Sequence, residues 1–102
     1  MLIPTEWAKE LVMNDKKITR VQFRKVRNQD TKKDEIVAIF VDEIWDIGGF
    51  SVACYSHGGQ HSGCAKEWYK HLRYATRAEY DALKRELESG FGYNFKVLNK
   101  AA

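Results

Sequence analysis

The longest uninterrupted hydrophobic run of the chain covers residues 36–41, with polar stretches on both sides. A strand with one face in solvent alternates between apolar and polar side chains, whereas a strand covered on both faces does not. The pattern therefore predicts a central strand over residues 35–42, buried on both faces. An earlier strand is expected over residues 18–27, because its apolar positions alternate, and the polar stretch 28–34 is typical of a loop.

Two more strands are expected in the rest of the chain. Gly48 and Gly49 interrupt the hydrophobic pattern and are followed by a third strand over residues 50–56. Residues 93–97 alternate between apolar and polar side chains, which predicts a final strand that returns to the sheet.

Helical spacing and capping residues predict three helices. Thr5 is the expected N-cap of a first short helix that ends near Asn14, and Ser62 is the expected cap of a second helix over residues 65–72. The third helix has the clearest signal, because Thr76 with Glu79 three positions later forms a capping-box pattern. Its end is expected at Gly90, and these side chains share its apolar stripe: Tyr80, Leu83 and Leu87.

Together the elements indicate an α+β fold. The 102 residues suit one domain with one core, so residues 1–102 are taken as a single domain. We expect an antiparallel sheet of about four strands with the helices packed on one face, in the order α-β-β-β-α-α-β.

Composition supports a globular, cytoplasmic protein. Hydrophobic residues make up 44% of the chain and charged residues 30%, a balance that argues against disorder. The hydrophobic runs are too short to cross a bilayer, and Glu6 and Glu10 lie where a signal peptide would be uncharged. No membrane association is therefore expected, and cytoplasmic cysteines would stay reduced unless a metal holds them.

The net charge of +3 is concentrated near the amino terminus, where residues 1–34 carry nine Lys and Arg against five Asp and Glu. Such residues provide most of the nonspecific affinity for nucleic acid. The alternative is an ordinary solvent-exposed strand guarded by basic side chains. The candidate nucleic-acid contacts are Arg20, Arg24, Lys25 and Arg27.

The densest group of potential metal ligands lies in residues 54–64, which contain Cys54, His57, His61 and Cys64. Thiolate and imidazole are the ligands that zinc selects, so these four side chains are a candidate zinc site. The spacing between the two histidines is shorter than in common zinc motifs. The alternative is that both cysteines are packing residues.

Nucleophilic catalysis is a further hypothesis for this segment. Cys64 is expected at the start of a helix and His61 lies three positions before it, so the thiolate could be stabilised by both. Nothing in the sequence indicates an orienting carboxylate or an oxyanion hole to accompany them, and no catalytic residue is assigned.

The second half of the chain resembles a group of small uncharacterised bacterial and mobile-element proteins. The resemblance is carried by residues 55–61, which read Tyr-Ser-His-Gly-Gly-Gln-His, and then by Ala75, Thr76, Glu79, Tyr80, Leu83, Glu86, Leu87, Gly92 and Tyr93. It implies a shared fold but no activity, and the group has no fixed cysteines at the places of Cys54 and Cys64. The resemblance leaves four residues as a candidate functional loop: Tyr55, His57, Gln60 and His61.

The sequence therefore favours a small non-enzymatic accessory or interaction protein, with an unidentified protein as its partner. A zinc-binding protein that uses the Cys54–Cys64 segment is the first alternative, and a nucleic-acid-binding module that uses the basic strand is the second. The sequence predicts neither a specific partner nor an oligomeric state.

Overall fold

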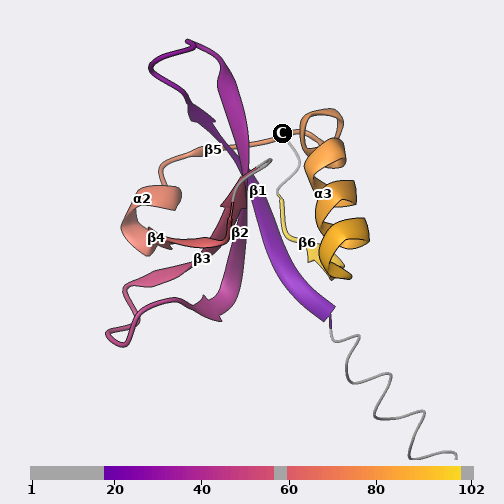
Figure 1. The fold of residues 1–102 in the computed structure, drawn as a ribbon. Coiled ribbons are helices and arrows are strands. Elements are labelled where there is room, and N and C mark those ends of the chain that lie inside the picture. The colour runs from indigo at the N-terminus through magenta and orange to yellow at the C-terminus, as the bar shows by residue number, and fades with distance from the viewer. Residues whose placement is uncertain (1–17, 57–59, 100–102) are drawn as a thin grey trace, which may run out of the picture.

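The computed structural model describes residues 18–56 and 60–99, and within them the chain forms a twisted sheet with helices on both sides (Figure 1). Four long-range strand pairings are antiparallel and give the order β4-β3-β2-β1-β5. The strands are β1 (Ile18–Arg27), β2 (Asp34–Ile44), β3 (Ser51–Ser56), β4 (Ser62–Ala65) and β5 (Arg73–Tyr74). A sixth strand, β6 (Asn94–Val97), runs parallel to the first part of β1.

The central strand was predicted correctly. In β2, Val37 is 5% exposed and the next three residues are fully buried, so both faces of the strand are covered. Side chains of β2 alternate between two separate core clusters, as the pleat of a strand requires. One cluster contains Ala38 and Phe40, and the other contains Val37 and Ile39.

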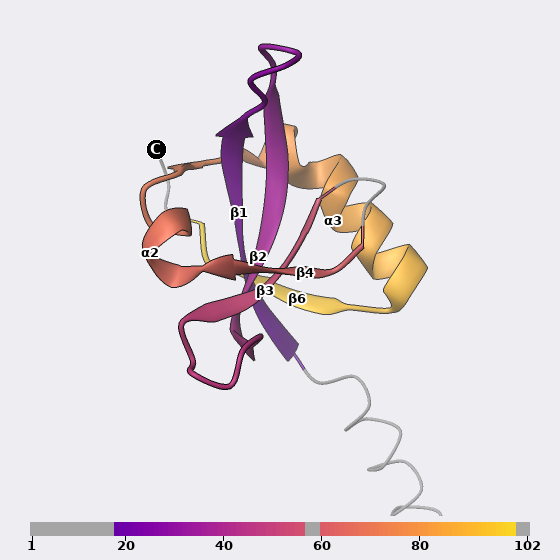
Figure 2. The same cartoon turned by 60° about the vertical axis from the view of Figure 1, so that its left-hand side comes forward.

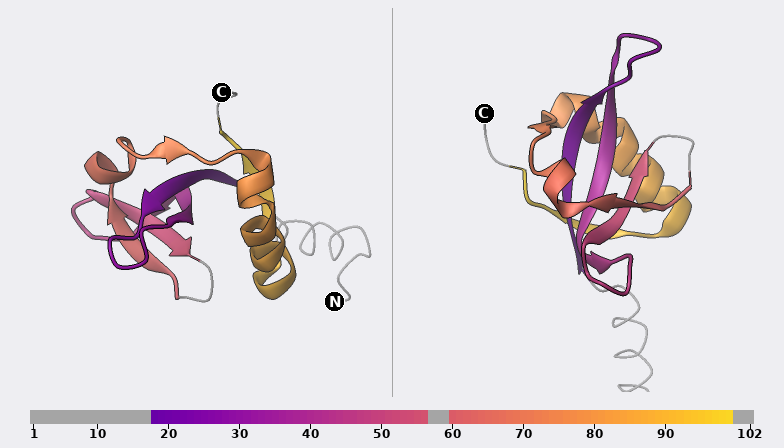
Figure 3. Two further views of the ribbon diagram at one scale, coloured as in Figure 1. Left: turned by 90° about the horizontal axis from the view of Figure 1, so that it is seen from above. Right: turned by 90° about the vertical axis from the view of Figure 1, so that its left-hand side faces the viewer.

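Each core cluster is closed by a different helix, so the expectation of helices on one face is wrong. Helix α3 (Arg77–Phe91) places Leu83 and Leu87 on the Phe40 cluster. Helix α2 (Lys66–Tyr69) places Tyr69 on the Ile39 cluster. Figure 3 shows the two helices on opposite sides of the sheet. We call these the α3 face and the α2 face of the sheet.

The expected four-stranded antiparallel sheet is also wrong, since six strands are present in the described residues and β6 is parallel to β1. The extra strands are short. Strand β4 takes the place of the loop and first turn of the expected helix over residues 65–72. Ser62 lies in β4 rather than at a helix cap, and α2 begins after Ala65 without a side-chain cap.

Helix α3 begins as the sequence predicts. The Thr76 side chain accepts a hydrogen bond from the Glu79 amide, and the Glu79 carboxylate accepts one from the Thr76 amide at 2.9 Å. The helix continues past Gly90 to Phe91 and is capped by Gly92, whose φ of 75° is the left-handed conformation that glycine adopts easily.

The chain after β6 is held by a side chain that no sequence pattern indicated. Asn99 accepts a hydrogen bond from the Phe23 amide at 2.7 Å. Its amide nitrogen donates to the carbonyls of Phe23 and Ala75. Asn99 thus connects the segment after β6 to β1 and to Ala75, the residue before the N-cap of α3. The predicted first helix lies outside the described residues.

Candidate functional site

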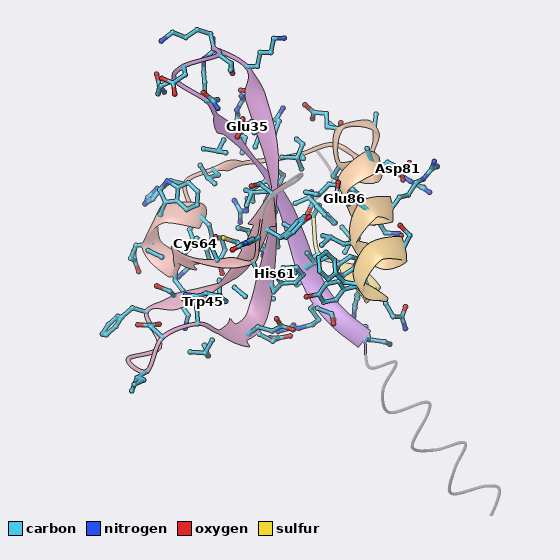
Figure 4. All side chains as sticks on the ribbon, in the orientation of Figure 1. Glu35, Trp45, His61, Cys64, Asp81 and Glu86 are labelled. Atoms are coloured by element: carbon cyan, nitrogen blue, oxygen red, sulfur yellow. The ribbon has the colours of Figure 1, made fainter. Side chains whose placement is uncertain are left out.

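Two residues of the candidate loop, Tyr55 and His61, lie beside Phe91 at the end of α3. Tyr55 is buried near the end of β3, Gln60 is exposed, and His61 is half-buried just before β4. His57 lies outside the described residues. Figure 4 shows His61 on the α3 side of the sheet.

His61 lies in an aromatic cluster on the α3 face. Its Nε2 is 2.9 Å from the hydroxyl of Tyr93, which precedes β6. Its ring centroid lies 5.5 Å from that of Phe40 and 5.0 Å from those of Tyr55 and Phe91. Burial, followed by the charge of Glu43, raises the pKa of Tyr93, so the neutral hydroxyl that pairs with His61 is favoured.

Tyr55 joins the same cluster to α3. Its hydroxyl donates a hydrogen bond of 2.6 Å to the Glu86 carboxylate, and this bond raises the pKa of Tyr55 because it favours the phenol over the phenolate. His61 pairs with Tyr93, and Tyr55 pairs with Glu86. Both pairs adjoin the aromatic rings of this cluster, an arrangement typical of side chains that stabilise the fold.

The two cysteines lie on the opposite face of the sheet. Cys54 and Cys64 are both buried in the cluster that α2 closes, on adjacent strands β3 and β4. Their thiols interact directly, and the Ser62 hydroxyl lies 3.4 Å from the Cys54 sulfur. The thiol of Cys64, by donating to Cys54, lowers the pKa of Cys54 to about 6 and raises that of Cys64.

The sheet therefore separates His61 from the two thiols (Figure 4). In the described part of the chain, no three His, Cys, Asp or Glu side chains come close enough to share a metal ion. The structure does not bring Cys54, His61 and Cys64 together, and the same separation removes His61 as a base for Cys64. Of the candidate zinc ligands in the described residues, the two cysteines lie on the α2 face and His61 lies on the α3 face.

The candidate nucleic-acid contacts of β1 are divided between its two faces, because alternate residues of a strand point in opposite directions. Arg20 forms a bidentate pair with Asp42, at 2.7 and 2.6 Å. Lys25 forms an ion pair of 3.2 Å with Glu79. Arg27 is exposed at the end of β1.

Arg24 is a core residue rather than a surface cation. It is 7% exposed, its guanidinium carbon lies 3.9 Å from the ring centroid of Tyr74, and its Nη1 donates to the Leu72 carbonyl at 2.6 Å. The remaining nitrogens donate to the Gln22 side chain at 2.8 and 3.0 Å. These four basic residues consequently do not form one free basic surface.

A hollow of about 360 Å³ lies between the first half of α3 and the sheet. Its two carboxylates already have partners, since Glu35 accepts from Asn28 at 2.8 Å and Glu79 pairs with Lys25. Both carboxylates among the described lining residues are therefore already paired.

The turn between β2 and β3 carries an apolar surface that the sequence analysis missed. Four large side chains there are exposed, by 54%, 52%, 108% and 75%, and we call them the hairpin surface: Ile44, Trp45, Ile47 and Phe50. Their signal in the sequence was the close spacing of large apolar residues around Gly48 and Gly49, which was interpreted only as a break between strands.

The hairpin surface is held by an ordered turn. The Asp46 carboxylate accepts a hydrogen bond of 2.8 Å from the Ser51 amide, and the Gly49 amide donates to the Asp46 carbonyl at 3.1 Å. Gly49 has a φ of 74°, a conformation that favours glycine. The Phe50 ring lies over the backbone of Gly48. The apolar side chains are consequently displayed by a fixed backbone.

None of the described helices is long and apolar enough to cross a membrane. The chain matches no family model, no curated protein and no solved structure at the significance required.

Proposed function

We propose that the protein is a non-enzymatic interaction module that binds another protein through the hairpin surface. The observation that carries this proposal is the exposure of four large apolar side chains within seven residues, 44–50. Single exposed apolar residues are common, but a contiguous exposed group marks an interaction site.

The order of the turn supports this function. An ordered turn loses less conformational entropy on binding than a flexible turn does. More of the free energy gained by burying apolar surface therefore contributes to affinity. The hydrogen bonds of Asp46 to Ser51 and Gly49 hold the turn before any partner arrives. Trp and Phe are also enriched among the residues that dominate binding energy at interfaces.

The charge of the segment favours a protein over a nucleic acid or a lipid surface. Between residues 42 and 51 the chain has no Lys or Arg. Asp42 in this segment is paired with Arg20, so Glu43 and Asp46 carry the negative charge of the segment. These carboxylates would repel phosphate groups of nucleic acids and anionic lipids. The partner that fits best is a protein with an apolar patch bordered by basic side chains.

The test uses the Ile47→Asp variant, because Ile47 is fully exposed and its replacement leaves the core intact. Proteins retained by the immobilised wild-type chain are identified by mass spectrometry, and binding of the purified partner is then measured by calorimetry. We expect Ile47→Asp to weaken that binding by roughly tenfold or more. The matched control is Ile18→Asp, at an exposed position of β1 outside the hairpin surface, which should bind normally.

Two results would overturn the proposal. One is a purified partner whose affinity is the same for Ile47→Asp, Phe50→Asp and the wild type. The other is binding of the wild type to vesicles of phosphatidylcholine and phosphatidylserine that Ile47→Asp abolishes, which would make the hairpin surface a lipid-binding element.

A further inference from the structure

The outer edge of β4 is unpaired in the described part of the chain. β4 is the last strand in the order β4-β3-β2-β1-β5, and Figure 2 shows it toward the viewer with α3 on the far side of the sheet. Edge strands are commonly protected from pairing by lysine, proline or an inward-pointing charge. The four residues of β4, Ser62–Ala65, contain none of these.

The register of β4 shows which backbone groups lie along this edge. The Lys66 amide donates to the Phe50 carbonyl at 3.0 Å, which places the Lys66 backbone toward β3. Antiparallel strands alternate between residues that bond inward and residues that bond outward, so Gly63 and Ala65 direct their N–H and C=O groups outward. The same alternation explains why the Ser51 carbonyl, opposite Ala65, accepts from Trp45 on the β2 side.

We propose that β4 pairs antiparallel with β4 of a second copy of the chain, about a twofold axis at Cys64. Gly63 of each copy then lies opposite Ala65 of the other, and the two pairs exchange four backbone hydrogen bonds. This interface is self-complementary, as a twofold dimer requires, because small uncharged residues meet small uncharged residues and no like charges face each other.

Trp45 provides a second reason for a second copy. Its indole lies directly over the Gly63 backbone, so that a Cβ at Gly63 would collide with the ring, and yet the residue is 52% exposed. Residues directly opposite each other in an antiparallel pair point to the same face of the sheet. The Ala65 methyl of the second copy would therefore lie beside the Trp45 indole and cover part of it.

Replacement of Ala65 by Pro tests this pairing with little effect on the fold. Ala65 has φ −66° and ψ 136°, values that proline adopts without strain, and its N–H points away from β3. The variant removes the outward donor and places the proline ring at the edge, while the bonds of Cys64 and Lys66 to β3 are kept. Ala65→Ser keeps the N–H and is the matched control.

The measurement is sedimentation equilibrium of the full chain under reducing conditions. The wild type and Ala65→Ser should form a concentration-dependent dimer, and Ala65→Pro should be monomeric with an unchanged melting temperature. A wild type that stays monomeric up to about 1 mM would overturn the proposal, as would a dimer of equal strength in Ala65→Pro. The dimer shares only Trp45 with the hairpin surface, so Ile47→Asp, which changes neither Trp45 nor β4, should leave the dimer intact.

The register of the proposed β4–β4 pairing is tested separately in the Cys54→Ser variant. In this variant Cys64 cannot form a disulfide with Cys54 of the same chain. Facing residues of a non-hydrogen-bonded pair have Cα atoms about 4.5 Å apart, within the range that a disulfide spans. Molecular oxygen with a copper–phenanthroline catalyst would accept two electrons and two protons from the paired Cys64 thiols and yield a covalent dimer. A dimer sensitive to Ala65→Pro that gives no such cross-link would overturn the register about Cys64.

Discussion

His61 and Tyr93 are 32 positions apart in the chain, and a hydrogen bond of 2.9 Å joins the imidazole Nε2 of one to the hydroxyl of the other. The bond connects the segment before β4 to the segment before β6. It also lies inside an aromatic cluster, where an unpaired polar group costs more than it would in water.

Replacing Tyr93 by Phe should therefore lower the free energy of unfolding by about 0.5–1.5 kcal/mol, because the ring remains but the partner of His61 is lost. Urea denaturation measures the change. Tyr74→Phe is the control, since the described contact of Tyr74 uses its ring face against Arg24 and survives the change. Equal stability of Tyr93→Phe and the wild type would mean that His61 exchanges Tyr93 for water without loss.

The polar cluster could not have been assembled from the sequence. Tyr55 and His61 were candidates because they belong to the run 55–61 that carries the resemblance. Their hydrogen-bond partners, Glu86 and Tyr93, come from α3 and from the segment after it. Which distant side chain meets a given residue depends on the packing of α3 on the sheet, and hydrophobic periodicity does not encode that arrangement.

The cap of α3 gives a prediction from a feature that the sequence does encode. Thr76→Ala should cost about 1 kcal/mol of stability, because the Glu79 amide loses its side-chain acceptor. Thr76→Ser keeps that acceptor and should stay close to the wild type in chemical denaturation. If alanine and serine are equally tolerated, the Thr76 hydroxyl contributes nothing measurable to the helix.

Because both faces of β2 are buried, truncation of a side chain on either face should destabilise the protein. Ile39→Ala should cost about 2–5 kcal/mol and Phe40→Ala roughly 3–5 kcal/mol, because each leaves a cavity in a different cluster. Ile47→Ala, at a fully exposed position, should change stability by less than about 0.5 kcal/mol. Thermal and urea unfolding would both show the contrast, and a tolerated Ile39→Ala would place the α2 face in contact with solvent.

The correct predictions for the fold concern features that depend on residues close together in the sequence, and the wrong ones concern features that depend on contacts between distant residues. The burial of β2 and the start of α3 follow from side chains that are neighbours in sequence, so the pattern was sufficient. Strand β4 has only small residues with weak preference for any state, and its conformation comes from pairing with β3. The faces on which α2 and α3 pack are likewise set by the whole sheet.

The thiol pair gives a prediction with a defined pH window. Cys54 has a pKa of about 6 in the folded protein, below its ordinary value near 9, because Cys64 and Ser62 donate hydrogen bonds to its thiolate. The unfolded chain therefore binds more protons than the folded one between these values. The contribution of Cys54 to stability should grow as pH rises from about 6 to about 9, and should be lost as pH falls through 6.

Thiolate absorbance in the ultraviolet, followed during a pH titration, measures this effect directly. We expect one thiolate per folded chain to appear with a midpoint near pH 6, and the raised pKa of Cys64 to keep the second thiol protonated beyond pH 9. Cys64→Ala removes a hydrogen-bond donor and should shift the midpoint of Cys54 upward, whereas Cys64→Ser supplies a hydroxyl donor and should shift it less. A wild type without thiolate below pH 9 would show that burial beside Ile39 and Tyr69 outweighs both hydrogen bonds.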